Sequence, residues 1–129
     1  MDKTLVAVLN DLMFQVKIQE IAKRSGLRTL FVKSQAEALA QAREKPVLMI
    51  LDLNYAASDP LQLIEKLKAD AETKSVPLIG YVSHVQTDIR QAARECGCDL
   101  VLARSAFVQN LGELLEQYTT KAENCGHLS

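Results

Sequence analysis

Residues 47–51, with the sequence VLMIL, constrain the fold of this chain more than any other stretch. Five consecutive apolar residues without alternation are typical of a strand buried on both faces, and such strands occur mainly in parallel sheets covered by helices. Asp52 follows directly, where such a strand leaves the core. Ligands of open α/β sheets bind at the carboxyl ends of the strands, so Asp52 is a candidate site residue. Taken alone, an acid at a strand end is more often a solvated side chain.

Strand-like and helix-like segments alternate along the chain. The strand-like segments are residues 4–9, 29–32, 47–51, 76–82 and 99–103, and the helix-like ones are 12–24, 35–44, 60–68, 87–96 and 105–118. This alternation predicts an α/β protein with a doubly wound five-stranded parallel sheet, in the flavodoxin-like order 2-1-3-4-5, and helices on both faces. Residues 1–118 are expected to form one domain of the 129-residue chain, and residues 119–129 a flexible C-terminal tail.

Several helix ends carry capping signals. Ser34 and Ser105 are predicted to accept a hydrogen bond from an N–H group of the first turn, and Asp59 is predicted to do the same before a proline at the first helical position. Gly26 and Gly97 are predicted to end the helices that precede them.

Charge, the N-terminal segment and the cysteines exclude several classes of function. The formal net charge of −1 argues against a direct nucleic-acid-binding surface. The first apolar segment is too short for a signal peptide or a membrane span, so we expect a cytoplasmic protein that makes no membrane contact. The three cysteines are expected to be reduced thiols. Cys96 and Cys98 fit neither a redox motif nor a zinc site and are interpreted as packing residues.

Oxygen-bearing side chains follow two strands that the predicted order makes neighbours. Asn10 and Asp11 follow the first strand, and Asp52 follows the third. Carboxylate and amide oxygens are hard ligands suited to Mg²⁺, so their convergence predicts a metal-binding crevice. Because clustered carboxylates repel, removing Asp11 or Asp52 is expected to leave the fold intact or to stabilise it.

The chain resembles the receiver domains of response regulators, the phosphoryl-accepting modules of bacterial two-component signalling, in an atypical form. The resemblance spans residues 4–118. It rests on the acidic-pair position at Asn10 and Asp11, on Asp52 within the sequence ILDLN, on the sequence VPLI at residues 76–79, and on the sequence AARECGCD at residues 92–99.

The resemblance implies that Asp52 accepts a phosphoryl group, with Asp11, Asp52 and the main-chain oxygen of Asn54 holding Mg²⁺. The implied phosphoryl donor is a sensor histidine kinase or a phosphotransfer protein. The chain is then not an enzyme beyond its own phosphorylation. Positioning and charge neutralisation carry most of the catalysis of phosphoryl transfer, and such a crevice supplies both.

Four positions of the predicted site depart from the family pattern. Asn10 replaces one acid of the usual pair, so metal binding should be weak. Val82 stands where the family has the hydroxyl residue of its switch, and Ser83 follows one position later, on the opposite face of a regular strand. Val101 stands where the family has the switching aromatic residue. Arg104 replaces the family's lysine and can still bind phosphate.

Three functions remain open at this point. The first is a receiver that signals through phosphorylation of Asp52. The second is a degenerate receiver that binds proteins without phosphorylation, and the third is a small enzyme on the same fold. In the family a downstream protein often binds the face formed by the fourth helix, the fifth strand and the fifth helix. Here that face includes Arg90, Arg94, Gln109 and Glu113.

Overall fold

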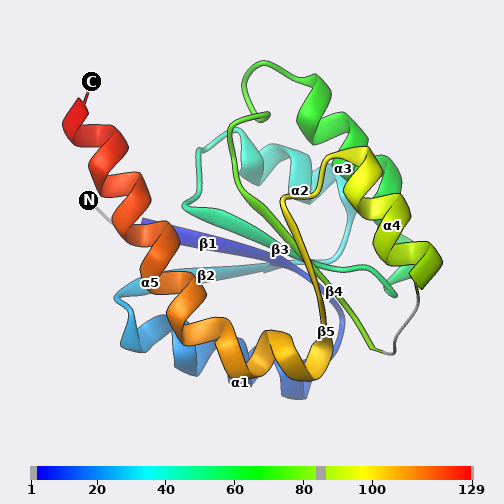
Figure 1. Ribbon diagram of the computed structural model, residues 1–129, viewed down its shortest axis with the longest axis horizontal. Coiled ribbons are helices and arrows are strands. Elements are labelled where there is room, and N and C mark those ends of the chain that lie inside the picture. Colours follow the sequence, from blue (N-terminus) through cyan, green and yellow to red (C-terminus); the bar gives the residue numbers. More distant parts are fainter. Residues whose placement is uncertain (1–2, 84–86, 129) are drawn as a thin grey trace.

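The computed structural model describes the backbone of residues 3–83 and 87–128, and the side chains of residues 3–83 and 88–119. Within these residues five strands form one parallel sheet in the order β2-β1-β3-β4-β5, which confirms the predicted doubly wound topology (Figure 1). The elements in chain order are β1 (Lys3–Val8), α1 (Leu12–Arg24), β2 (Leu27–Val32), α2 (Gln35–Ala42), β3 (Leu48–Asp52), the 3-10 turn η1 (Ala56–Ser58), α3 (Pro60–Ala69), β4 (Leu78–Val82), α4 (Thr87–Cys96), β5 (Leu100–Ala103) and α5 (Arg104–Leu128).

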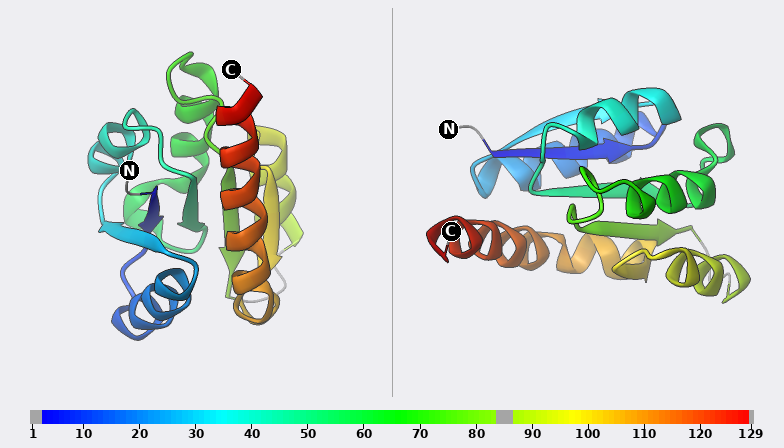
Figure 2. Two further views of the ribbon diagram at one scale, coloured as in Figure 1. Left: turned by 90° about the vertical axis from the view of Figure 1, so that its left-hand side faces the viewer. Right: turned by 90° about the horizontal axis from the view of Figure 1, so that it is seen from above.

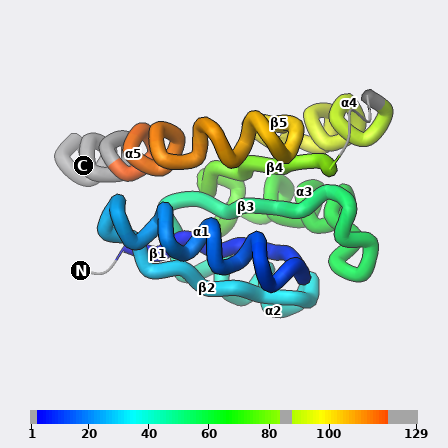
Figure 3. The backbone as a smooth tube through the Cα atoms, turned by 90° about the horizontal axis from the view of Figure 1, so that it is seen from below, coloured from blue at the N-terminus to red at the C-terminus, as the bar shows by residue number. Residues whose placement is uncertain are grey.

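Helices cover both faces of the sheet. Helices α1 and α5 pack against each other on one face, and α2, α3 and α4 form a second layer on the other (Figures 1 and 2). The central strand β3 therefore has no solvent-facing side, which explains why its sequence is apolar without alternation. Figure 3 views the molecule from below and shows α1 and α5 side by side in front of the strands.

Each face of the sheet has its own apolar core. Ile50 of β3 and Tyr81 of β4 point into the core under α1 and α5, whereas Met49 and Leu51 point into the core under α2, α3 and α4. Successive side chains of a strand point to opposite faces, so the two cores divide each central strand between them. Tyr81, at 1% exposure, is among the largest fully buried side chains.

Several of the predicted helix ends are confirmed. The Ser34 hydroxyl accepts a hydrogen bond of 3.1 Å from the Glu37 N–H group at the start of α2. Gly26 and Gly97 follow α1 and α4 with φ of 74° and 113°, a left-handed region that costs glycine little.

Two predicted caps are wrong. Asp59 makes no side-chain capping bond, because it ends η1 in a left-handed conformation with φ of 47° instead of the extended conformation of a capping residue. Its main-chain oxygen instead accepts the first helical hydrogen bond of α3, from the Leu63 N–H group at 2.9 Å. Ser105 does not precede the last helix, because α5 begins at Arg104 directly after β5.

The last helix is longer than its apolar pattern indicates. The buried stripe of Phe107, Leu111 and Leu115 is present, but the helix continues past Tyr118 to Leu128. The flexibility of residues 119–129 stays a prediction. Within the described part of the chain, no helix combines the length and apolar character that a membrane span requires.

Candidate functional site

Asp52 ends β3 between the carboxyl ends of β1 and β4. The Asn54 N–H group donates to Asp52 Oδ1 at 2.9 Å, and the Tyr55 N–H group donates to the main-chain oxygen of Asp52 at 3.1 Å. These bonds form a tight turn that fixes the carboxylate where the strand leaves the core. The side chain is half-buried, so it is held in place and still open to a ligand.

Burial raises the pKa of Asp52 above its ordinary value, because the charged carboxylate loses part of its hydration. Hydrogen bonding from the Asn54 N–H group opposes this shift, and the positive charge of Arg104 opposes it further. A raised pKa makes the carboxylate oxygen more basic. It also means that the ionised side chain is less stable in the folded protein than in the unfolded chain.

Asp11 joins two elements at the same edge of the sheet. Its Oδ1 atom accepts a hydrogen bond of 3.2 Å from the Phe14 N–H group and so caps α1. Its Oδ2 atom pairs with the Arg104 guanidinium at 2.7 Å, which ties the start of α1 to the start of α5. The hydrogen bond from Arg104 is the largest cause that lowers the pKa of Asp11, followed by the cap bond. Asp11 is therefore a structural cap that lies at the edge where the sequence predicts the site.

The guanidinium of Arg104 also lies 4.3 Å from the centre of the Phe14 ring, in cation–π geometry. Phe14, Tyr81 and Phe107 form an aromatic cluster beneath it. The ring centres of Phe14 and Tyr81 are 4.9 Å apart, and those of Tyr81 and Phe107 are 5.0 Å apart. This cluster connects the crevice to α1, β4 and α5.

The sequence reasoning missed Phe14 and Tyr81 as neighbours of the site. Tyr81 is the direct partner of Asp52 across the β3–β4 pairing, so both side chains lie on the same face. Burial raises the pKa of Tyr81, and the negative charge of Asp52 raises it further. The available signal was the strand register, since aligning β3 with β4 places an aromatic beside the acid.

The other predicted crevice residues lie at the same edge of the sheet. The Ser83 N–H group donates to Asn54 Oδ1 at 2.7 Å, which ties the end of β4 to the loop after Asp52. Asn10 lies between β1 and α1 with an exposed side chain. The fold therefore brings Asn10, Asp11, Asp52, Asn54, Ser83 and Arg104 to the edge where the sequence places them.

Known proteins of similar sequence are response regulators, although no family model matches the chain. The polar-differentiation response regulator DivK of Brucella ovis is 24% identical over 119 residues, which cover 92% of this chain and 97% of the relative. In sequence this chain is similar to response regulators, and it has the fold of their receiver domains. Receiver domains are in general signalling modules of two-component systems and not enzymes.

Solved structures agree with the receiver fold. A response regulator from Hahella chejuensis superposes with a TM-score of 0.80 at 18% identity, covering 91% of this chain and 95% of that one. The receiver domain of a sensor histidine kinase from Pseudomonas aeruginosa superposes with a TM-score of 0.78 at 17% identity, covering 92% and 98%. That structure is described with a magnesium ion coordinated in its active-site cleft.

The two residues that the sequence predicts as degenerate switch positions belong to the apolar core. Val82 and Val101 are 0% and 1% exposed, and both lie in the core under α2, α3 and α4. Neither can donate a hydrogen bond to a group in the crevice. The Tyr81 phenol instead lies on the other face of the sheet, and Ser83 and Arg104 follow the ends of β4 and β5.

The crevice fits a divalent cation only in part. Asp11 and Asp52 are suitable oxygen donors, but both oxygens of Asp11 already accept hydrogen bonds. Among the residues that the structure describes, no three or more histidine, cysteine, aspartate or glutamate side chains are placed to hold a metal. A cation at Asp11 would therefore have to compete with the Arg104 guanidinium.

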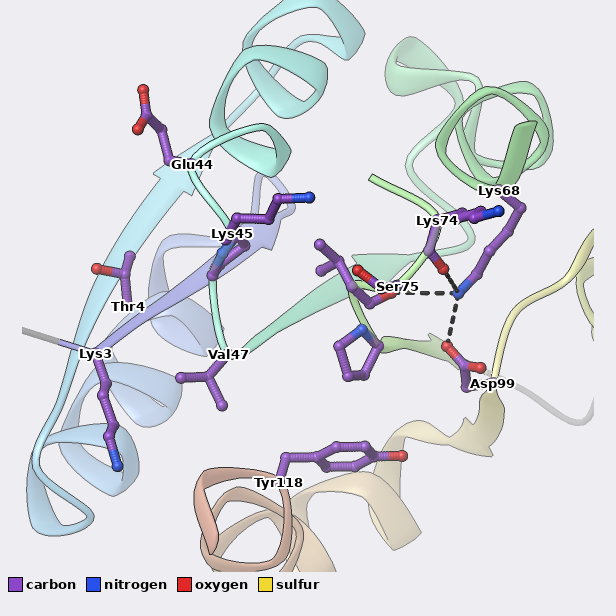
Figure 4. A pocket seen from close by; sticks show the side chains of 13 residues that line it. Lys3, Thr4, Glu44, Lys45, Val47, Lys68, Lys74, Ser75, Asp99 and Tyr118 are labelled. Carbon is purple, nitrogen blue, oxygen red and sulfur yellow. Dashed lines mark hydrogen bonds and ion pairs between the residues drawn. The ribbon is translucent and has the colours of Figure 1, made fainter. Parts of the chain in front are cut away.

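A hollow of about 700 Å³ lies at the opposite end of the sheet, beside the amino ends of the strands (Figure 4). The Lys68 ammonium donates to the main-chain oxygens of Lys74 and Val76 at 3.2 Å each, and to Asp99 Oδ2 at 3.1 Å. Asp99 Oδ2 in turn accepts a hydrogen bond of 2.7 Å from the Leu78 N–H group at the start of β4. Lys68 therefore holds the segment before β4 and the start of β5 together.

Proposed function

We propose that this receiver accepts a phosphoryl group on Asp52 from a phosphohistidine of a sensor kinase or a phosphotransfer protein, as part of a two-component phosphorelay. The position of Asp52 carries the proposal. It is a half-buried carboxylate of raised pKa at the carboxyl edge of a parallel sheet, held by the Asn54 N–H group and lying near the Arg104 cation. A cytoplasmic location and partner binding through the face of α4, β5 and α5 belong to the same proposal.

In the transfer step, a carboxylate oxygen of Asp52 attacks the phosphorus atom. The new oxygen–phosphorus bond forms as the nitrogen–phosphorus bond of the phosphohistidine breaks, and its electron pair returns to the imidazole nitrogen. The Asn54 N–H group orients the attacking carboxylate. The charge of Arg104 acts on Asp52, and its guanidinium would neutralise charge on the phosphoryl oxygens, because guanidinium groups bind phosphate with paired hydrogen bonds.

Weak Mg²⁺ binding is part of the proposal. Asp11, Asp52 and the main-chain oxygen of Asn54 would hold the ion, which would supply further neutralisation of phosphoryl charge. Asn10 adds no charge, and Arg104 already neutralises Asp11 at 2.7 Å. Both features support a lower affinity than a crevice with two unpaired acids would have.

An exposed apolar patch beside the crevice supports docking of the phosphoryl donor. Leu12, Met13 and Val16 at the start of α1 are 70%, 84% and 57% exposed. Leu12 directly follows Asp11, and all three side chains lie in the first turns of α1, which begins at the edge of the sheet where Asp52 lies. A protein bound to them would therefore lie beside the crevice. Contiguous apolar side chains on a surface are typical of protein-binding sites.

The test is intact-mass spectrometry after incubation with Mg²⁺ and acetyl phosphate. The parent chain should gain the mass of one phosphoryl group, and Asp52→Asn should gain none. Asp59→Asn is the matched control, because Asp59 is an exposed acid of the same loop and asparagine tolerates its left-handed conformation. Equal labelling of Asp52→Asn and the parent would refute the assignment of Asp52.

A degenerate receiver that binds proteins without phosphorylation is the second candidate. The observation that favours it is the Asp11–Arg104 ion pair, which occupies one of the two carboxylates of the crevice. The apolar burial of Val82 and Val101 adds to it. A parent chain that gains no mass from acetyl phosphate or from a phosphorylated phosphotransfer protein would support this candidate over the first.

A further inference from the structure

Arg104 is one of the residues through which the crevice contacts the layer formed by α1 and α5. It is the first residue of α5 and follows β5 directly. Its guanidinium pairs with Asp11 Oδ2 at 2.7 Å and stacks on the Phe14 ring at 4.3 Å. Asp11 is the N-cap of α1, and Phe14 supplies the N–H group that Asp11 caps. Both partners of Arg104 thus belong to the first turn of one helix.

The aromatic cluster extends this contact into the molecule. Phe14 packs on Tyr81 of β4 and lies 5.9 Å from Phe107 of α5, between ring centres. Tyr81 is the strand partner of Asp52. The chain has only three phenylalanines and three tyrosines, so half of its aromatic rings gather at this point. A displacement of the Phe14 ring therefore affects the packing of α1 against both β4 and α5.

We propose that Arg104 couples the occupancy of Asp52 to the position of helix α1. The proposal rests on the proposed function, because the occupant is a phosphoryl group on Asp52. A phosphoryl group carries more negative charge than the Asp11 carboxylate and offers three acceptor oxygens, so it attracts the guanidinium away from Asp11. Binding of this anion therefore draws the guanidinium away from Asp11 Oδ2 and from its place over the Phe14 ring.

The surroundings of Arg104 leave room for this movement. An open hollow of about 490 Å³ borders Arg104, Phe14 and Ser83. On the other face of the sheet, the buried Val82 and Val101 offer no polar group that occupancy can attract. The response is therefore expected in α1 and the first turns of α5, and not in α4.

Amide NMR of the full chain tests the proposal, with beryllofluoride as the acyl-phosphate mimic and Mg²⁺ present in every sample. In the parent, beryllofluoride should shift the amides of Asn54 and Ser83 and also amides of α1 beyond its first turn. In Arg104→Ala, loss of the cation should weaken beryllofluoride binding, so the mimic is added until the amides of Asn54 and Ser83 stop shifting. At that saturation the shifts of α1 should be absent. Arg43→Ala is the matched control, because it removes an arginine that pairs with exposed acids far from the crevice.

Three results would overturn the proposal in distinguishable ways. If beryllofluoride shifts only the amides of Asn54 and Ser83 in the parent, phosphoryl acceptance stays supported and the coupling to α1 is refuted. Shifts of α1 that persist in Arg104→Ala would remove Arg104 as the coupling residue. A parent without shifts at Asn54 and Ser83, together with no mass gain from acetyl phosphate, would refute the proposed function and the coupling with it.

A measurement without any ligand tests the same contact. Arg104→Ala should speed the hydrogen exchange of the Phe14 amide by about two- to five-fold, the factor that corresponds to the loss of an exposed cation–π contact. Arg43→Ala should leave this rate unchanged. An unchanged Phe14 rate in Arg104→Ala would show that the guanidinium does not hold α1, which contradicts the proposal.

Discussion

Replacing Asp11 by alanine is predicted to destabilise the fold, although the sequence alone suggested no effect or a gain from reduced carboxylate repulsion. Asp11 is capped into α1 through Phe14 and paired with Arg104 at 2.7 Å. Loss of an N-cap costs about 1 kcal/mol. The ion pair is more than one-third exposed on both sides, so solvent screening limits it to about 0.5 kcal/mol.

The expected loss for Asp11→Ala is therefore about 1.5 kcal/mol in the free energy of unfolding. This corresponds to a fall in Tm of about 5 °C for a chain of this size. Asp11→Asn separates the two contributions, because asparagine caps helices as well as aspartate but carries no charge. It should cost only the ion-pair part. The assay is urea unfolding followed by circular dichroism at pH 7, with unchanged m-values.

The pH dependence of the ion-pair part has a definite sign. The pKa of Asp11 is lowered below 3.8 in the folded protein, so the stabilisation from its charge is complete above that value. It is lost as the pH falls through the lowered folded pKa, and the gap between the parent and Asp11→Asn should close there. An Asp11→Ala protein with the same free energy of unfolding as the parent would show that Asp11 does not stabilise the fold. Equal losses for Asp11→Asn and Asp11→Ala would show that the helix cap contributes nothing.

Three further predictions follow from other contacts. Arg104→Ala should raise the Mg²⁺ affinity in an NMR titration, because Asp11 loses its competing cation, and an unchanged affinity would contradict the competition. Gly97→Ala should lower the free energy of unfolding, measured in urea, by about 1–3 kcal/mol, because φ is 113° and an added Cβ would lie 2.8 Å from Lys68 Cγ. A loss below about 0.5 kcal/mol, the size of an ordinary surface substitution, would exclude this strain. In the native protein, Cys98 should react with iodoacetamide more slowly than Cys96, because burial raises the pKa of Cys98 to about 11, and equal rates would contradict its burial.

The fold could be predicted because its signals are local and repeated. The unbroken apolar run before Asp52 identifies a doubly covered strand, and the regular alternation of strands and helices leaves few topologies. The convergence of Asp11 and Asp52 then follows from the strand order. A helix end could be predicted from a local signal too. The sequence from Ser34 to Glu37 predicts the hydrogen bond that the Glu37 N–H group donates to the Ser34 hydroxyl.

The contacts within the site could not be predicted because they depend on tertiary geometry. Nothing in the sequence indicates that Arg104 pairs with Asp11, 93 positions away, or that its guanidinium lies over Phe14. Asp59 failed as a cap for a related reason, since the preceding turn forces it into a left-handed conformation. Such outcomes require the relative placement of several elements, which residue patterns do not contain.

The central claim is that Asp52 is the side chain that accepts the phosphoryl group. Borohydride reduction of the phosphorylated chain, followed by peptide mapping, tests it most directly, because an acyl phosphate is reduced to an alcohol at the modified residue. Reduction is expected at Asp52 in the parent and in Asp59→Asn, and none is expected in Asp52→Asn. Reduction at Asp11 or at another acid, or a chain that carries no reducible acyl phosphate, would contradict it.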